Sequence, residues 1–132
     1  MQRMLLVVVL ATVCLIFYAC SDKISTEEAK VLVSLDEIQR GFESNISYDD
    51  FMGLLKTAKA EIAMLKTSRK KKNPCFINAV DKCASAYEIA GKAWKRKNEI
   101  ADEKRKQDMD MALSFSLSFA ALSIQRAGKC YQ

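Results

Sequence analysis

Apolar residues recur at helical spacing in the stretch that follows the N-terminal segment. In a helix expected over about residues 26–41 they are separated by four, three and four positions, and Ser25 followed by Glu28 is a capping-box pattern. A second stripe follows Ser47, a favourable N-cap, and extends to about Thr67. The two stripes consist of Val31, Leu35, Ile38 and Phe42, and of Phe51, Leu55, Ala58, Ile62 and Leu65.

The next segment predicts a longer third helix. Asn73 is a favourable N-cap, and Pro74 fits the first helical position, where a missing N–H group is no loss. Apolar residues then alternate steps of four and three at Phe76, Val80, Cys83, Tyr87, Ala90 and Trp94. We place the bend that ends this helix between Asn98 and Gln107, with a fourth helix starting near Gln107.

In residues 113–119 two periods compete. Apolar and polar residues alternate there as in a β-strand, but no other stretch alternates in this way, and an unpaired strand cannot satisfy its backbone. We therefore predict a helix with Gly128 as its C-terminal cap. Its core-facing side is expected to consist of Met109, Ala112, Leu113, Leu117, Ala120, Ile124 and Ala127, widened by Phe115, Phe119 and Leu122.

Four helices joined by mostly short turns predict an all-α fold, an up-down-up-down antiparallel four-helix bundle. With 132 residues, one Pro, four Gly and 50% hydrophobic residues, the chain suits a single globular domain. We expect this domain to cover residues 20–132 and to follow a cleaved N-terminal signal segment at residues 1–19.

The first residues have the pattern of a signal peptide. Arg3 supplies a positive charge, and the segment from Met4 to Ala19 is uncharged. As a helix this segment would reach about 24 Å, short of the roughly 30 Å hydrocarbon core of a bilayer, and no basic stop-transfer cluster follows directly. We therefore expect cleavage rather than a permanent membrane span.

The end of this leader, Phe17-Tyr18-Ala19-Cys20, resembles the lipobox of bacterial lipoprotein precursors. Ala19 and Cys20 match the motif, and the resemblance implies that Cys20 is lipidated, becomes the new N-terminus and tethers the domain to membrane lipid. Ser21 at the next position implies the outer membrane of the bacterial cell envelope. The alternative is ordinary cleavage after Ser21, because Ala19 and Ser21 also satisfy a small-x-small rule, and it would give a secreted protein.

The remaining cysteines test the topology. Once Cys20 is lipidated, three are left, an odd number for an oxidising compartment. Cys75 and Cys83 are about 12 Å apart along one helix, beyond the roughly 7 Å limit between Cα atoms for a disulfide. The start of the third helix lies beside the end of an antiparallel fourth, so we predict the bridge Cys75–Cys130. The alternatives are Cys83–Cys130 and three reduced thiols.

A basic turn precedes the third helix. Arg69, Lys70, Lys71 and Lys72 are expected at the anchored end of the bundle. Each cation near an anionic bilayer contributes about 1 kcal/mol, so this turn is a candidate membrane-facing surface. The alternative is a solvated turn of the kind that any soluble bundle carries.

A second basic group lies at the opposite end. Trp94, Lys95, Arg96 and Lys97 combine an aromatic ring with positive charge, which suits an envelope protein or an anionic polymer as partner. The alternative is that Trp94 continues the apolar stripe and packs in the core. The chain carries a net charge of +5, but outside the cytoplasm this favours anionic lipid or polymer, and we expect no nucleic acid partner.

The sequence offers little for catalysis. It has no histidine, no G-x-S-x-G elbow and no Gly-rich phosphate loop, and its cysteines lack the close pairs of zinc sites. We therefore expect no cofactor and no metal. The predicted function is a non-catalytic helical module for binding, assembly or protection in the cell envelope, tethered through Cys20. The alternatives are a freely secreted, disulfide-containing helical factor and a histidine-independent enzyme.

Overall fold

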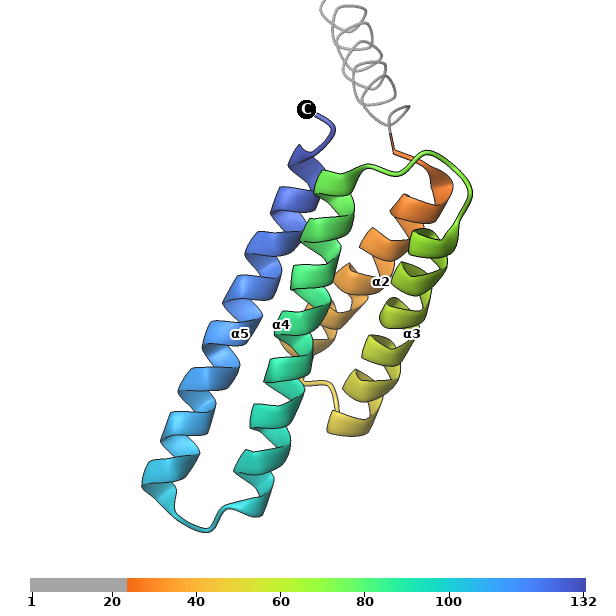
Figure 1. Ribbon diagram of the computed structural model, residues 1–132. Helices are drawn as coiled ribbons and strands as arrows, with labels where there is room; N and C mark the ends of the chain where they lie inside the picture. Colours follow the sequence, from red (N-terminus) through yellow and green to blue (C-terminus); the bar gives the residue numbers. More distant parts are fainter. Residues whose placement is uncertain (1–23) are drawn as a thin grey trace, which may run out of the picture.

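The computed structural model describes residues 24–132, and every regular element within them is an α-helix. The helices are α2 (Thr26–Glu43), α3 (Tyr48–Thr67), α4 (Pro74–Glu99) and α5 (Glu103–Lys129). Figure 1 shows them side by side in alternating directions, which confirms the predicted up-down-up-down antiparallel bundle. The predicted signal segment, residues 1–19, and the predicted lipid site, Cys20, lie outside the described residues.

The bundle has two different ends (Figure 1). One end carries the start of α2, the loop between α3 and α4, and the C-terminus. At the other end the α4–α5 hairpin extends past the α2–α3 turn, because α4 and α5 have 26 and 27 residues whereas α2 and α3 have 18 and 20. We call these the proximal and the distal end. α4 contacts all three other helices, while α5 packs mainly against α4.

The first three helices begin at the predicted capping residues. Ser25 and Glu28 form the capping box, with hydrogen bonds of 3.2 Å from the Glu28 N–H to the Ser25 hydroxyl and 3.0 Å from the Ser25 N–H to the Glu28 carboxylate. The Ser47 hydroxyl accepts from the Asp50 N–H at 3.1 Å. Asn73 caps α4 with its side-chain oxygen in the same way.

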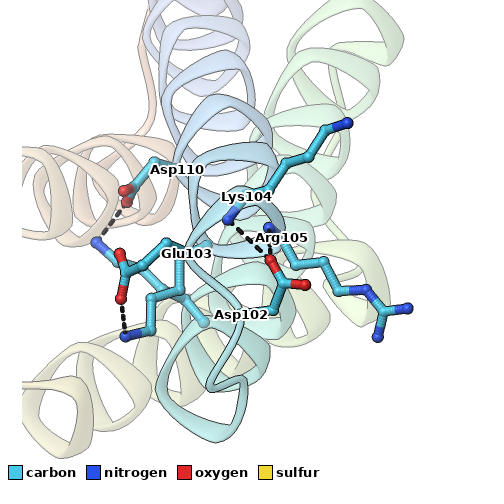
Figure 2. Close-up of polar contacts among 7 residues, drawn as sticks. Asp102, Glu103, Lys104, Arg105 and Asp110 are labelled. Carbon is cyan, nitrogen blue, oxygen red and sulfur yellow. Dashed lines mark hydrogen bonds and ion pairs between the residues drawn. The ribbon is translucent and has the colours of Figure 1, made fainter.

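The fourth helix begins earlier than predicted. We expected its start near Gln107, but α5 starts at Glu103. The cause is Asp102, whose carboxylate accepts from the backbone N–H groups of Lys104 and Arg105 at 2.9 and 3.2 Å (Figure 2). The break itself, at residues 100–102, lies within the predicted interval.

Two helices end later than predicted: α2 at Glu43 rather than at about residue 41, and α5 at Lys129 rather than before Gly128. After α2, the Ile46 N–H donates to the Gly41 carbonyl at 2.9 Å and Asn45 adopts a positive φ of 55°, so Asn45 is the residue that reverses the chain. A Cβ atom at position 41 would lie 2.7 Å from Ile46 Cδ1, so Gly41 leaves room for the turn. The expected cap Gly128 instead lies inside α5, because the chain stays helical to Lys129.

The core is built mainly by α2, α3 and α4. Its largest fully buried side chains include Tyr87, Phe51, Phe76 and Leu35. The buried residues of α5 are all small: Ala120, Ser123 and Ala127. Residues 113–119 are helical, which confirms the choice between the two competing periods. Because α5 is held along a narrow strip of small residues, its larger apolar side chains remain partly or fully outside the core.

A disulfide joins the start of α4 to the end of α5. Cys75 and Cys130 are bonded with Cα atoms 5.8 Å apart, which confirms the predicted pairing, and Cys83 is a free thiol in the core. The Asn73 side-chain amide donates to the Cys130 carbonyl at 3.2 Å, and the Tyr131 ring lies against Phe76. These contacts fasten the C-terminus to the proximal end.

Replacing Cys75 and Cys130 together by Ala is expected to lower the free energy of unfolding by about 2–4 kcal/mol, because the bridge spans 55 residues of the unfolded chain. Guanidinium titration followed by circular dichroism measures the change. A reductant should destabilise the parent protein by a similar amount and leave the double variant unaffected. Equal midpoints for the parent protein with and without reductant would contradict the stabilising role of the bridge.

Candidate functional site

The predicted basic turn is at the proximal end, but two of its four cations contact the protein itself. Lys70 forms an ion pair of 2.5 Å with Glu27 at the start of α2, and this hydrogen bond is the main cause of the lowered pKa of Glu27. Lys72 donates to the carbonyl of Lys66. Arg69 and Lys71 are exposed, and neither forms an ion pair within residues 24–132.

The predicted surface at Trp94 to Lys97 is not one continuous patch. The half-buried Trp94 ring lies 5.5 Å from the Phe42 ring and 5.6 Å from the Tyr48 ring, measured between centroids. Trp94 thus closes the distal end of the core, in agreement with the packing alternative. Lys97 points toward α5 and pairs with Asp110 at 2.5 Å, whereas Lys95 lines a groove on the α3 side of α4.

Some charged side chains of the distal turn form contacts within the turn itself (Figure 2). The Lys106 ammonium lies 2.7 Å from the Glu103 carboxylate, one helical turn earlier. Asp102 is occupied in capping α5. The Lys104 and Arg105 side chains point away from these contacts (Figure 2) and are exposed.

An apolar stripe on α5 is the most exposed apolar surface in the described part of the chain. Met111, Phe115, Phe119 and Leu122 follow one another at spacings of four, four and three residues and are 67%, 80%, 45% and 54% exposed. Ile89 of α4, which is 55% exposed, lies beside this α5 stripe across a shallow cleft of about 380 Å³. Contiguous apolar surface of this kind marks interaction sites in folded proteins.

We predicted that Phe115, Phe119 and Leu122 would widen the core-facing side of α5, and this was wrong. α5 contacts α4 along most of its length but α2 only over a short stretch, so no helix of residues 24–132 covers its outer side. A sequence signal was present: seven other apolar positions already complete one face of this helix. The three extra residues form a second apolar stripe. A helix with two apolar stripes buries both only when a separate partner packs against each of them.

A groove between α3 and α4 was not predicted from the sequence. It has a volume of about 670 Å³ and a floor that includes Met52, Gly53, Leu55 and Gly91. Four lysines line its rim: Lys56 and Lys59 from α3, and Lys92 and Lys95 from α4. One end is closed by the ion pair between Lys59 and Glu88, and Tyr48 stands at the other end.

The described residues hold no recognisable catalytic or metal centre. No group of three or more potential metal-ligating side chains occurs among them. The Cys83 thiol is buried, and burial raises its pKa to about 12, so it is protonated and unreactive at neutral pH. Burial likewise raises the pKa of Tyr87 and Tyr131 above the usual tyrosine range.

The chain was compared with family models, with curated proteins and with solved structures. No family model matches it, and no curated protein or solved structure is significantly similar. Of the helices in residues 24–132, none combines the length and apolarity needed to cross a bilayer.

Proposed function

We propose that this protein is a non-catalytic binding module of the bacterial cell envelope, tethered to membrane lipid through Cys20, which holds a neighbouring envelope protein against the apolar stripe of α5. The observation that carries the proposal is the exposure of this stripe, from Met111 to Leu122, in an otherwise well-packed domain. Ser21 after Cys20 favours the outer membrane as the site of attachment.

The proximal end of the bundle suits a tether at Cys20. Position 20 lies only a few residues before α2, so a lipid there would hold the proximal end close to the bilayer. Arg69 and Lys71 project from the loop at the same end and are free to meet anionic head groups. Lys70 and Lys72 are engaged within the domain, so the basic turn supports the anchor with about two charges rather than four.

The direction of the α5 stripe points to a protein rather than to the bilayer. α5 runs along the long axis of the bundle, from the distal to the proximal end (Figure 1). If the proximal end rests on lipid, the stripe runs along the membrane normal. Its side chains then face neighbouring molecules in the envelope rather than the bilayer. The exposed residues Met111 to Leu122 span about 16 Å along this axis, which matches about three turns of an apposed helix.

A secreted helical factor is the second candidate. Cleavage after Ser21 would leave the same domain and the same α5 stripe without an anchor. A histidine-independent enzyme is third, because no group with an activated nucleophile is found in the described residues.

The fate of Cys20 separates the first two candidates. Replacing Cys20 by Ser in the full chain is expected to abolish incorporation of labelled palmitate and to move the protein from the membrane to the soluble fraction. Replacing Cys14 by Ser is the matched control and should leave both unchanged. Persistent labelling of the Cys20→Ser variant would refute the tether.

The contribution of the basic turn is tested by charge reversal. Replacing Arg69 and Lys71 by Glu is expected to weaken binding of the lipidated protein to phosphatidylglycerol vesicles by one to two orders of magnitude at low salt, since each cation contributes about 1 kcal/mol. The same change at Lys30 and Lys82, which are exposed on helices, is the control. Equal vesicle flotation of both variants would show that the basic turn does not contribute to membrane binding.

The α5 stripe is tested by site-specific photo-crosslinking in the intact envelope. A benzophenone side chain at position 115 should capture a discrete partner that is also captured from position 122 and lost when Phe119 is replaced by Asp. Position 64 on α3 is the control, because the exposure of Met64, 65%, lies between those of Phe115 and Leu122, but Met64 is outside the stripe. Capture of the same partner from position 64, or none from position 115, would contradict the proposal.

A further inference from the structure

We propose that the groove between α3 and α4 binds a single-chain anionic amphiphile, with the apolar chain on the groove floor and the acidic head group between the lysines of the rim. The groove lies on a different side of α4 from the α5 stripe, since its residues come from α3 and α4 alone. The inference therefore holds or fails independently of the anchor and of the α5 partner.

The floor of the groove provides room and an apolar lining. Its volume of about 670 Å³ falls within the range of roughly 300–1,000 Å³ that is usual for small-molecule sites. Met52 is 39% exposed in it, and Leu55 lies beneath with 2% exposure. Removing such surface from water favours an alkyl chain over a purely polar ligand.

Two glycines create the groove. A Cβ atom on Gly53 would have no heavy atom within 4 Å, so the absence of a side chain there leaves the α3 wall open. A Cβ atom on Gly91 would lie 3.0 Å from the Phe51 ring and 3.3 Å from the Met52 sulfur. Gly91 therefore lets these side chains approach the α4 backbone closely, and the missing side chain at Gly53 leaves open space on the α3 wall.

The rim selects for negative charge. Lys59 is neutralised by Glu88, but Lys56, Lys92 and Lys95 are exposed and form no ion pair within residues 24–132. Three like charges around one apolar groove repel one another, and an acidic head group relieves this repulsion. The long alkyl portions of the lysines can also cover a bound chain while their ammonium groups remain in water.

The dimensions favour an alkyl chain over a peptide helix or a nucleic acid. From Tyr48 to Lys59 the groove extends about 16 Å along α3 before the Lys59–Glu88 pair closes it. A docked peptide helix needs an apolar face on both walls of a groove, whereas here Lys56 and Lys59 of α3 and Lys92 and Lys95 of α4 leave only a narrow apolar strip at the floor. A nucleic acid strand requires a longer charged track with several stacking rings, whereas Tyr48 is the one aromatic residue in the lining.

The test uses the full chain in phosphatidylcholine vesicles and palmitic acid that carries a photoreactive diazirine at its terminal end. After irradiation, mass spectrometry should locate the label in residues 48–59 and 88–95. Dodecyltrimethylammonium, which has the chain but the opposite charge, should not compete. Label confined to α5, or equal competition by the cationic amphiphile, would overturn the proposal.

Two variants with matched controls identify the groove as the site. Gly53→Leu fills the open wall and should abolish labelling, while Gly128→Leu, at a helical glycine that is equally free of neighbours, should not. Replacing Lys92 and Lys95 by Gln should reduce labelling about tenfold, and the same change at Lys30 and Lys129 should leave it unchanged. Undiminished labelling of the Gly53→Leu protein, with its helical spectrum intact, would refute the site.

The source of the ligand is identified by the unlabelled lipid that competes with the photoreactive palmitic acid for the parent protein. Unlabelled palmitate as the effective competitor identifies a free fatty acid, and lysophosphatidylglycerol, which has one acyl chain and an anionic phosphate, identifies a single-chain membrane lipid. Either result supports an anionic amphiphile. Competition by neither of them would overturn the assignment.

Discussion

The burial of α4 is the constraint on which the rest of this domain depends. α4 contacts each of the other three helices and provides most of the packing surface for α5, and its buried side combines the large residues Phe76 and Tyr87 with a run of small ones near its distal half. Small residues allow close approach of neighbouring helices on more than one side. The disulfide from Cys75 to Cys130 then links the end of α5 covalently to the start of α4.

Both candidate surfaces follow from this arrangement. On one side of α4, the small buried residues of α5 make a narrow contact that leaves Phe115 and its neighbours in solvent. On another side, Gly91 draws α3 close while Gly53 leaves an open groove above the contact. Large side chains in place of the small residues of α5 and of the two glycines would change the spacing of the helices and fill the groove. Neither surface would then exist in its present form.

Much of the fold could be predicted from the sequence because its signals are local. Ser25, Ser47 and Asn73 each cap the helix that follows them, and a cap needs only the next three residues. The disulfide pairing followed from the antiparallel topology and from the length of a helix. The start of α5 was missed because Asp102 lies among many charged residues, where its capping role has no distinct pattern.

The sequence by itself determined the number of helices, the start of three of them, their order and the cysteines that pair, since these depend on periodicity and on neighbours along the chain. Only the tertiary structure decided which apolar residues of α5 are covered, and that Lys59 meets Glu88 while Lys56, Lys92 and Lys95 stand together around an apolar groove. The physical reason is that a hydrophobic residue is buried only where another element arrives to cover it, and that arrival depends on the rotation and spacing of whole helices, which no local pattern encodes.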